Sequence, residues 1–148
     1  MNPTILLKLE TGDVTIEMLP DRAPNHVSQI TKLANDGFYD GLTLHRVIDG
    51  FMAQMGCPHG DGTGGSGTKI NAEFNDESHQ RGICSMARSA DPNSADSQFF
   101  ICFDDASFLD TQYTVWGKVL NGMEAVDAAQ KGEPPKAPTK IISMRSEG

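Results

Sequence analysis

Cysteine is scarce in this sequence, and the few cysteines form no recognisable framework. Cys57, Cys84 and Cys102 are an odd set of three, and no pair of them has the Cys-x-x-Cys spacing of redox and zinc motifs. We therefore expect reduced thiols, with Cys84 and Cys102 packed as small core residues in apolar segments. Cys57 and His59 resemble half of a metal site, but no second pair of ligands stands near them, so no metal is expected.

Long hydrophobic runs are also absent. No apolar stretch approaches the roughly 20 residues that a membrane-spanning helix needs, so we expect no membrane segment. Residues 1–4 lead directly into a strand-like segment and lack the basic and apolar parts of a secretory signal. The expected location is therefore cytoplasmic.

Basic residues are outnumbered by acidic ones, 12 against 20, and the net charge is −8. Such a surface repels phosphate backbones, and the basic residues are scattered along the chain rather than clustered. Nucleic-acid binding is therefore not expected. Nothing in the sequence demands an oligomer, so we expect a monomer.

The 148 residues suit a single domain, residues 1–148, that is long enough to bury a core. Val27, Ile30 and Leu33 recur at helical spacing and predict a helix over residues 24–35, which Gly37 ends. A shorter helix is expected over residues 123–130.

The rest of the chain is rich in short β-type segments. Strands are predicted at residues 5–10, 14–18, 42–48, 51–56, 83–87, 97–102, 114–120 and 141–144. Many short strands with two helices indicate a mainly β protein, and closure into an antiparallel barrel would remove exposed strand edges.

Arg46 is unusual because it is a charged residue in an otherwise apolar segment. It lies among Leu44, Val47 and Ile48, and a permanently charged guanidinium is costly beside apolar neighbours unless something holds it. A salt-bridged or snorkelling arginine on a strand edge is one explanation. The other explanation is that Arg46 has a functional role, and residues Phe51 to Gln54, which follow it closely, are relevant to that role.

Strand alternation places polar and apolar side chains where a surface pocket needs them. In residues 98–102, Gln98 and Phe100 share one face, whereas Phe99 and Ile101 share the other. Met52 and Gln54 likewise share a face. One face of these strands can therefore fill a core while the other offers an apolar floor with a few polar groups.

Three runs taken in order resemble the cyclophilin family of peptidyl-prolyl cis-trans isomerases, and the resemblance extends from about Thr4 to Ile142. The runs are Leu44–Gln54, Ser85–Cys102 and Phe108–Val119, supported by residues 37–41 and by the Gly-rich loop 62–65. The resemblance implies a closed eight-stranded antiparallel β-barrel capped by two α-helices, with the active groove on its outer face.

The same resemblance implies an enzyme that accelerates rotation about Xaa-Pro bonds and assists protein folding. Its partners would be proline-containing peptides and unfolded or folding proteins. Rotation costs roughly 18–20 kcal/mol because it breaks amide resonance. It needs no cofactor, metal or covalent intermediate, only a site that favours the twisted amide. We assign Arg46 to donate a hydrogen bond to the prolyl nitrogen and Gln54 to orient Arg46 and contact substrate.

The remaining site residues follow from the resemblance as a group. The proline pocket would be formed by Phe51, Met52, Phe100 and Leu109, the peptide would be flanked by Ala87, Arg88 and Gln98, and the rim would include Phe108 and Tyr113.

Some positions depart from the best-known members of the family. Phe108 stands where many have tryptophan, and the missing indole N–H leads us to expect only weak binding of cyclosporin. Tyr113 replaces a frequent histidine, which keeps an aromatic wall and is common in bacterial members. Arg88 replaces a frequent asparagine and adds charge at the rim of the groove.

Other titratable residues are interpreted more simply. Amide rotation needs no net proton transfer, so His45 is expected to be a hydrogen-bonded structural residue. Surface positions are expected for His26 and His79, and solvated loop positions for Asp104, Asp105 and Asp110.

Two alternatives to the enzyme remain. One is a module that binds proline-containing peptides without turnover, against which Arg46 argues because binding alone needs no donor at the prolyl nitrogen. The other is a redox-responsive protein using Cys57 or Cys102, which would require an exposed thiolate.

Overall fold

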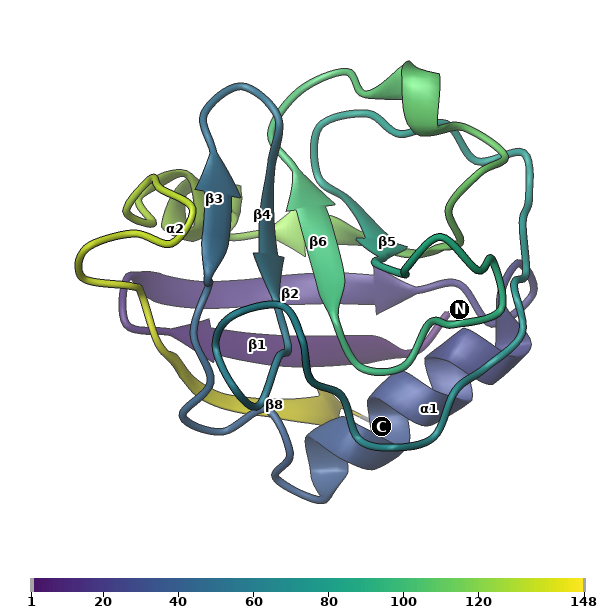
Figure 1. Cartoon of the computed structure of the whole chain (residues 1–148), viewed down its shortest axis with the longest axis horizontal. Coiled ribbons are helices and arrows are strands. Elements are labelled where there is room, and N and C mark those ends of the chain that lie inside the picture. The colour runs from purple at the N-terminus through teal and green to yellow at the C-terminus, as the bar shows by residue number, and fades with distance from the viewer. Residues whose placement is uncertain (1, 148) are drawn as a thin grey trace.

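The computed structural model describes residues 2–147 as one curled β-sheet with two α-helices and a single 3-10 turn (Figure 1). In chain order the elements are β1 (Thr4–Leu9), β2 (Gly12–Met18), α1 (Pro24–Asn35), β3 (Arg46–Ile48), β4 (Met52–Met55), β5 (Ile83–Met86), β6 (Phe99–Cys102), the 3-10 turn (Ser107–Leu109), β7 (Val115–Asn121), α2 (Met123–Asp127) and β8 (Ile141–Glu147). The mainly β fold class with eight strands and two helices is confirmed.

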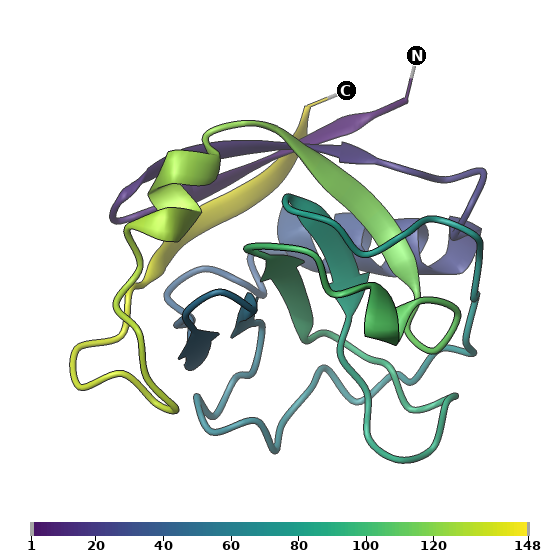
Figure 2. The ribbon, with the colours of Figure 1, turned by 90° about the horizontal axis from the view of Figure 1, so that it is seen from above.

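The strands form one antiparallel sheet in the order β3-β4-β6-β5-β7-β2-β1-β8. The sheet curls on itself, and within residues 2–147 no ladder joins its two edge strands, β3 and β8 (Figures 1 and 2). The expectation of a closed barrel is therefore wrong: the fold is an open, curled half-barrel. The opening is spanned by isolated bridges at Thr43–Lys140 and Val47–Gly132 and by backbone hydrogen bonds between residues 41–44 and 139–141. Pro134 and Pro135 follow Gly132, and a proline has no N–H with which to extend such pairing.

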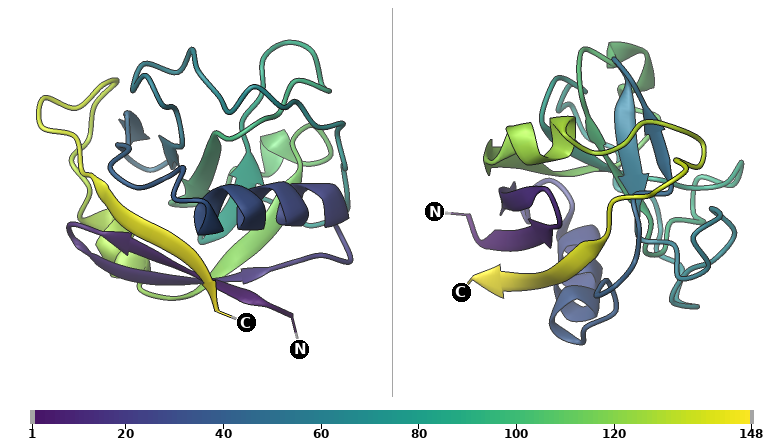
Figure 3. Two further views of the ribbon diagram at one scale, coloured as in Figure 1. Left: turned by 90° about the horizontal axis from the view of Figure 1, so that it is seen from below. Right: turned by 90° about the vertical axis from the view of Figure 1, so that its left-hand side faces the viewer.

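The concave side of the sheet holds the main hydrophobic core. Its centre is aromatic: the rings of Phe99 and Trp116 meet edge to face with centroids 5.2 Å apart, and Tyr39 meets Phe99 at 5.6 Å. Helix α1 lies across one end of the sheet and α2 lies beside β2 and β7 (Figure 3). The buried side chains of α1 include Val27, Ile30 and Leu33, as the helical spacing predicted.

Helix α2 is shorter than predicted. It ends at Asp127, where we expected it to continue to residue 130. The ammonium of Lys131 donates to the carbonyl oxygens of Asp127 and Ala129 at 2.8 and 3.1 Å, which satisfies the end of the helix as the chain turns away. No helix in the described part of the chain combines the length and apolar character that crossing a membrane requires.

All three cysteines are buried and unpaired. Burial raises the pKa of Cys84 well above its usual value and that of Cys102 to about 12. Burial also opposes ionisation of Cys57, but the backbone N–H groups of Gly64 and its neighbours outweigh it and lower the pKa of that thiol. The core positions expected for Cys84 and Cys102 are confirmed, and none of the thiols has the exposure that a redox-responsive site requires.

Candidate functional site

A surface pocket of about 180 Å³ opens on the convex side of β4 and β6. It is lined by Arg46, Phe51, Met52, Gln54, Ala87, Arg88, Phe100, Leu109 and Tyr113. All of these side chains belong to the predicted site. The structure thus brings together residues from three separated stretches of the chain.

The floor of this pocket is apolar because of strand register. Gln54 on β4 pairs with Phe100 on β6, so these side chains and that of Met52 emerge on one face of the sheet. Met52 and Phe100 are almost fully buried, and the ring of Tyr113 meets that of Phe100 edge to face at 5.9 Å. Phe108 does not line the pocket: it is 67% exposed and lies at the rim, with its ring 5.6 Å from that of Phe51.

Arg46 stands at the mouth of the pocket on the edge strand β3. Its register partner is Gln54, whose Oε1 accepts a hydrogen bond from Nη1 of the arginine at 3.4 Å. Its Nε donates to Oε1 of Glu133 at 3.1 Å, and the arginine side chain remains 44% exposed. The description of a salt-bridged arginine on a strand edge is therefore correct, and the same geometry leaves the guanidinium accessible from the pocket.

Gln98 joins the pocket to the Gly-rich loop. Its Oε1 accepts from Nε2 of Gln54 at 2.9 Å, and its Nε2 donates to the carbonyl oxygens of Gly62 and Gly64 at 3.0 and 2.9 Å. We expected Gln98 to flank a bound peptide. It lines the larger of two neighbouring pockets, and both its amide oxygen and its amide nitrogen already have hydrogen-bond partners within the protein.

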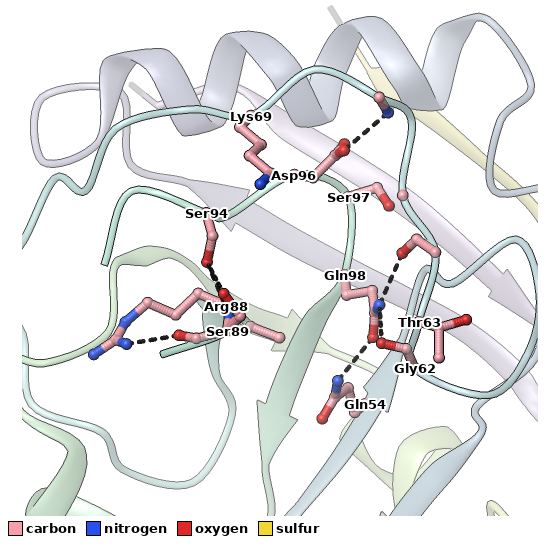
Figure 4. A pocket seen from close by; sticks show the side chains of 14 residues that line it. Gln54, Gly62, Thr63, Lys69, Arg88, Ser89, Ser94, Asp96, Ser97 and Gln98 are labelled. Carbon is pink, nitrogen blue, oxygen red and sulfur yellow. Dashed lines mark hydrogen bonds between the residues drawn. The ribbon is translucent and has the colours of Figure 1, made fainter. Parts of the chain in front are cut away.

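A second pocket of about 450 Å³ adjoins the first and shares Gln54, Ala87 and Arg88 with it (Figure 4). Its walls are the Gly-rich loop and the loop before β6. Asp96 holds the two loops together, because its carboxylate accepts from the backbone N–H groups of Ser66 and Gly67 at 2.9 Å. The Gly-rich loop was expected from the sequence, whereas this pocket was not.

Arg88 is fixed at the boundary of the two pockets. Its Nε and Nη2 donate to the carbonyl oxygen of Gln112 at 3.0 and 2.7 Å, and its guanidinium carbon lies 4.6 Å from the centre of the Tyr113 ring. The arginine therefore stacks on the aromatic wall instead of extending freely into solvent.

His79 lies beneath the pocket, and the expectation that it is a surface residue is wrong. Its ring is buried, with Nδ1 2.9 Å from Oδ1 of Asp110 and Nε2 2.8 Å from Oγ of Ser85. The ring stacks on Phe100 with centroids 6.1 Å apart. Asp110 is thus a structural partner and not merely a solvated loop residue. Asp110, His79 and Ser85 form a hydrogen-bonded series like that of a serine nucleophile and its base. Ser85 is nevertheless fully buried and beyond reach of a substrate, so no nucleophile is indicated.

The other histidines also differ from expectation. His26 is buried, not exposed, and its Nδ1 lies 2.6 Å from Oε1 of Glu73. His45 is buried, but within residues 2–147 neither of its ring nitrogens has a hydrogen-bond partner. Burial lowers the pKa of His45, which favours the neutral ring. The predicted structural histidine is therefore not held by hydrogen bonds.

Glu133 is the residue at this site that the sequence analysis missed. Its neighbours Gly132, Pro134 and Pro135 signal a loop, but no local pattern shows which strand that loop will meet. Across residues 2–147 no cluster of three or more His, Cys, Asp or Glu side chains is arranged to hold a metal ion.

Comparison with known proteins places these features in one family. The family described as "Cyclophilin type peptidyl-prolyl cis-trans isomerase/CLD" matches residues 4–146. A probable peptidyl-prolyl cis-trans isomerase of Brucella suis biovar 1 (strain 1330) is 50% identical, over 97% of this chain and 82% of its own. Peptidyl-prolyl cis-trans isomerase B of Bacillus subtilis (strain 168) is 46% identical, over 86% of this chain and 91% of its own.

Solved structures agree with the sequence relatives. A cyclophilin type peptidyl-prolyl cis-trans isomerase of Cryptosporidium parvum, crystallised in the presence of the dipeptide Ala-Pro, superposes with a TM-score of 0.90 at 27% identity. The match covers 98% of this chain and 99% of that one. By its sequence, its fold and its relatives, this chain belongs to the cyclophilin-type peptidyl-prolyl cis-trans isomerases.

Proposed function

We propose that this chain catalyses rotation about Xaa-Pro bonds in peptides and in unfolded or folding proteins, and that Arg46 stabilises the twisted amide. The observation that carries this proposal is the placement of one accessible guanidinium at the mouth of an apolar pocket. The Ala-Pro dipeptide named with the Cryptosporidium parvum structure supports a proline-containing ligand.

The apolar pocket is suited to a proline ring. Met52 and Phe100 form its floor, and Phe51, Leu109 and Tyr113 form its sides. Burying a ring of this size contributes about 1–3 kcal/mol. With the ring anchored, the chain on the other side of the bond is free to rotate, and the neighbouring larger pocket gives that part of the peptide room beside Ala87, Arg88 and Gln98.

Arg46 supplies what rotation itself requires. As the amide twists, the prolyl nitrogen loses its resonance and becomes a hydrogen-bond acceptor. A donor aimed at that nitrogen interacts with the transition state and not with either planar form, so it accelerates the reaction instead of merely tightening binding. Nε and one N–H of Nη1 are engaged by Glu133 and Gln54, so three of the five guanidinium N–H groups of Arg46 remain for a substrate.

Gln54 is placed to contact both Arg46 and a bound peptide. Its oxygen accepts from Arg46, and one of its two amide N–H groups donates to Gln98. The second N–H is available to a peptide carbonyl. The mechanism uses no covalent intermediate, metal or cofactor.

The test is NMR exchange spectroscopy on a short peptide containing Ala-Pro, with wild type and Arg46→Ala at equal concentration. We expect exchange between cis and trans to slow by roughly 10²–10³-fold in the variant, equivalent to about 3–4 kcal/mol, while peptide binding changes much less. Arg22→Ala is the matched control, because Arg22 also forms an exposed ion pair, with Asp76 at 2.8 Å, but does not line either pocket.

Two outcomes would contradict the proposal in different ways. If wild type binds the peptide without accelerating exchange, the chain is a proline-peptide binding module. If Arg46→Ala retains the wild-type rate, the chain is an isomerase but the role given to Arg46 is wrong.

A further inference from the structure

We propose that Glu133 is a positioning residue that orients the Arg46 guanidinium for catalysis. This inference rests on the role proposed for Arg46. It makes the loop between α2 and β8 part of the catalytic machinery, although that loop contributes no side chain to the lining of either pocket.

The backbone sets Glu133 opposite Arg46. Val47 and Gly132 form an isolated antiparallel bridge, in which each N–H donates to the other residue's carbonyl oxygen at 2.8 Å. In antiparallel pairing the residue before Val47 faces the residue after Gly132, so Arg46 and Glu133 are cross-strand partners. The segment carrying Glu133 passes beside β3 in Figures 1 and 3.

The backbone conformation on both sides of Glu133 depends on particular residues. Gly132 has a φ of +143°, and a Cβ there would lie 2.7 Å from the Cα of Pro135, so the turn that presents Glu133 requires glycine at this position. The two prolines that follow Glu133 restrict its backbone further. The carboxylate is therefore presented to Arg46 by a constrained segment tied to the same strand.

The contact defines the orientation of the guanidinium. Nε lies in the same rigid plane as the two terminal nitrogens, so a bond from Nε to Glu133 at 3.1 Å, together with the bond from Nη1 to Gln54 at 3.4 Å, restricts rotation of that plane. Without Glu133, only the 3.4 Å bond to Gln54 would remain, and the N–H groups that are left for a substrate would sample many directions.

Stability alone is a weak reason for this pair. The side chains of Arg46 and Glu133 are 44% and 56% exposed, and exposed ion pairs contribute little to folding. An orienting role predicts instead that the loss of Glu133 affects the step at which the amide twists and leaves peptide binding in place.

The first test separates kcat from KM on the same Ala-Pro peptide. Glu133→Ala should lower kcat about fivefold to tenfold with KM within about twofold of wild type, whereas Glu133→Gln keeps an oxygen acceptor and should recover most of the rate. Glu133→Lys places a like charge beside Arg46 and should lower kcat at least as far as alanine does. Glu17→Ala is the matched control: it removes a carboxylate that pairs with Lys118 at 3.6 Å on another strand, and it should leave both constants unchanged.

The second test observes Arg46 directly. The ¹⁵N–¹H resonance of its Nε, identified by its disappearance in Arg46→Lys, should shift and exchange faster with water in Glu133→Ala. The backbone amides of Met52 and Phe100 should stay in place, because the pocket floor is untouched.

Each outcome has a defined meaning. If Arg46→Ala abolishes turnover while Glu133→Ala keeps the wild-type kcat, Glu133 has no positioning role and the proposed function stands. A fall in kcat with an unchanged Nε resonance would also overturn the inference, because the effect would then not pass through Arg46. If Arg46→Ala retains its rate, the proposed role of Arg46 fails first.

Discussion

Oε1 of Gln98 accepts a hydrogen bond from Nε2 of Gln54 at 2.9 Å, and this bond connects the Gly-rich loop to the pocket. Gln98 in turn donates to the carbonyl oxygens of Gly62 and Gly64. Because Gln54 also contacts Arg46, three side chains form a continuous chain of hydrogen bonds from the loop to the guanidinium.

Removing Gln98, the side chain at the loop end of this chain of hydrogen bonds, should weaken catalysis moderately. Gln98→Leu deletes the acceptor for Gln54 and should lower kcat/KM about threefold to tenfold, while Gln98→Glu turns a negative oxygen toward two carbonyls and should cost at least as much. Exchange spectroscopy on a proline peptide measures kcat/KM for both variants. Gln80→Leu is the control, since Gln80 donates to Ser78 Oγ at 3.1 Å but lines neither pocket. Wild-type kcat/KM in Gln98→Leu would show that the connection is not used.

Phe100 should matter for binding and stability together. It is a buried part of the pocket floor, packed on His79 and Tyr113, so Phe100→Ala should raise the Kd for a proline peptide and reduce the free energy of unfolding by about 3–5 kcal/mol. Peptide titration by NMR and denaturant unfolding measure the two effects. Ile142→Ala, at a residue of β8 that is 58% exposed, should change neither appreciably. An unchanged Kd in Phe100→Ala would remove Phe100 from the proposed proline pocket.

Asp110 should make folding stability depend on acid pH. The backbone N–H of His79 and the side chains of Ser78 and His79 lower the pKa of Asp110 below its usual 3.8. A carboxylate with a lowered native pKa stabilises the fold above its unfolded pKa, and that stability is lost as pH falls through the native value. Asp110→Asn should therefore lower Tm at about pH 7, and the difference from wild type should narrow as pH falls below the usual 3.8, whereas Asp21→Asn, at an exposed position, should change Tm little. A constant Tm difference across this range would contradict the assignment.

Local patterns in the sequence were sufficient for the elements that bear the site. The spacing of Val27, Ile30 and Leu33 identified α1 at its observed bounds, and two-residue alternation placed Gln98 with Phe100 and Met52 with Gln54 on shared faces. Such patterns report which side of an element is apolar. Combined with the family resemblance, they predicted every residue that lines the smaller pocket.

Local sequence patterns could not predict the contacts between segments that are distant along the chain. Glu133 meets Arg46 across 87 residues, through a bridge that depends on where the chain passes after α2. The burial of His26 and His79 depends on carboxylates 47 and 31 residues away, without which a buried imidazole would be costly. Closure of the barrel was overestimated for the same reason, because the path of residues 133–138 between the bridges at Gly132 and Lys140 is set by distant contacts.

Alanine substitutions at two glycines should distinguish the cost of backbone strain from the cost of steric overlap. Gly41 and Gly122 both have positive φ, +81° and +90°, but a Cβ at Gly41 meets nothing within 4 Å, whereas one at Gly122 would overlap the carbonyl oxygen of Asp13. Gly41→Ala should reduce the free energy of unfolding by about 1–2 kcal/mol, the cost of the left-handed conformation alone. Gly122→Ala should lose more than about 3 kcal/mol, because the β1–β2 turn must also move. If denaturant unfolding shows the same loss of free energy of unfolding for both variants, the β1–β2 turn can move at little cost.

Phe108 should limit the affinity for cyclosporin. The resemblance to cyclophilins predicts weak binding because phenylalanine at this exposed rim position has no N–H to donate. Phe108→Trp restores an indole donor next to Phe51, and one hydrogen bond of this kind is worth about 0.5–1.5 kcal/mol, so the Kd should fall by roughly twofold to tenfold. Calorimetric titration measures this without interference from the buried Trp116. Phe108→Leu, which also lacks a donor, serves as the control and should bind no better than wild type. If tryptophan and phenylalanine bind cyclosporin equally, the missing N–H is not what limits affinity, and the shape of the rim around Phe51 and Phe108 becomes the better explanation.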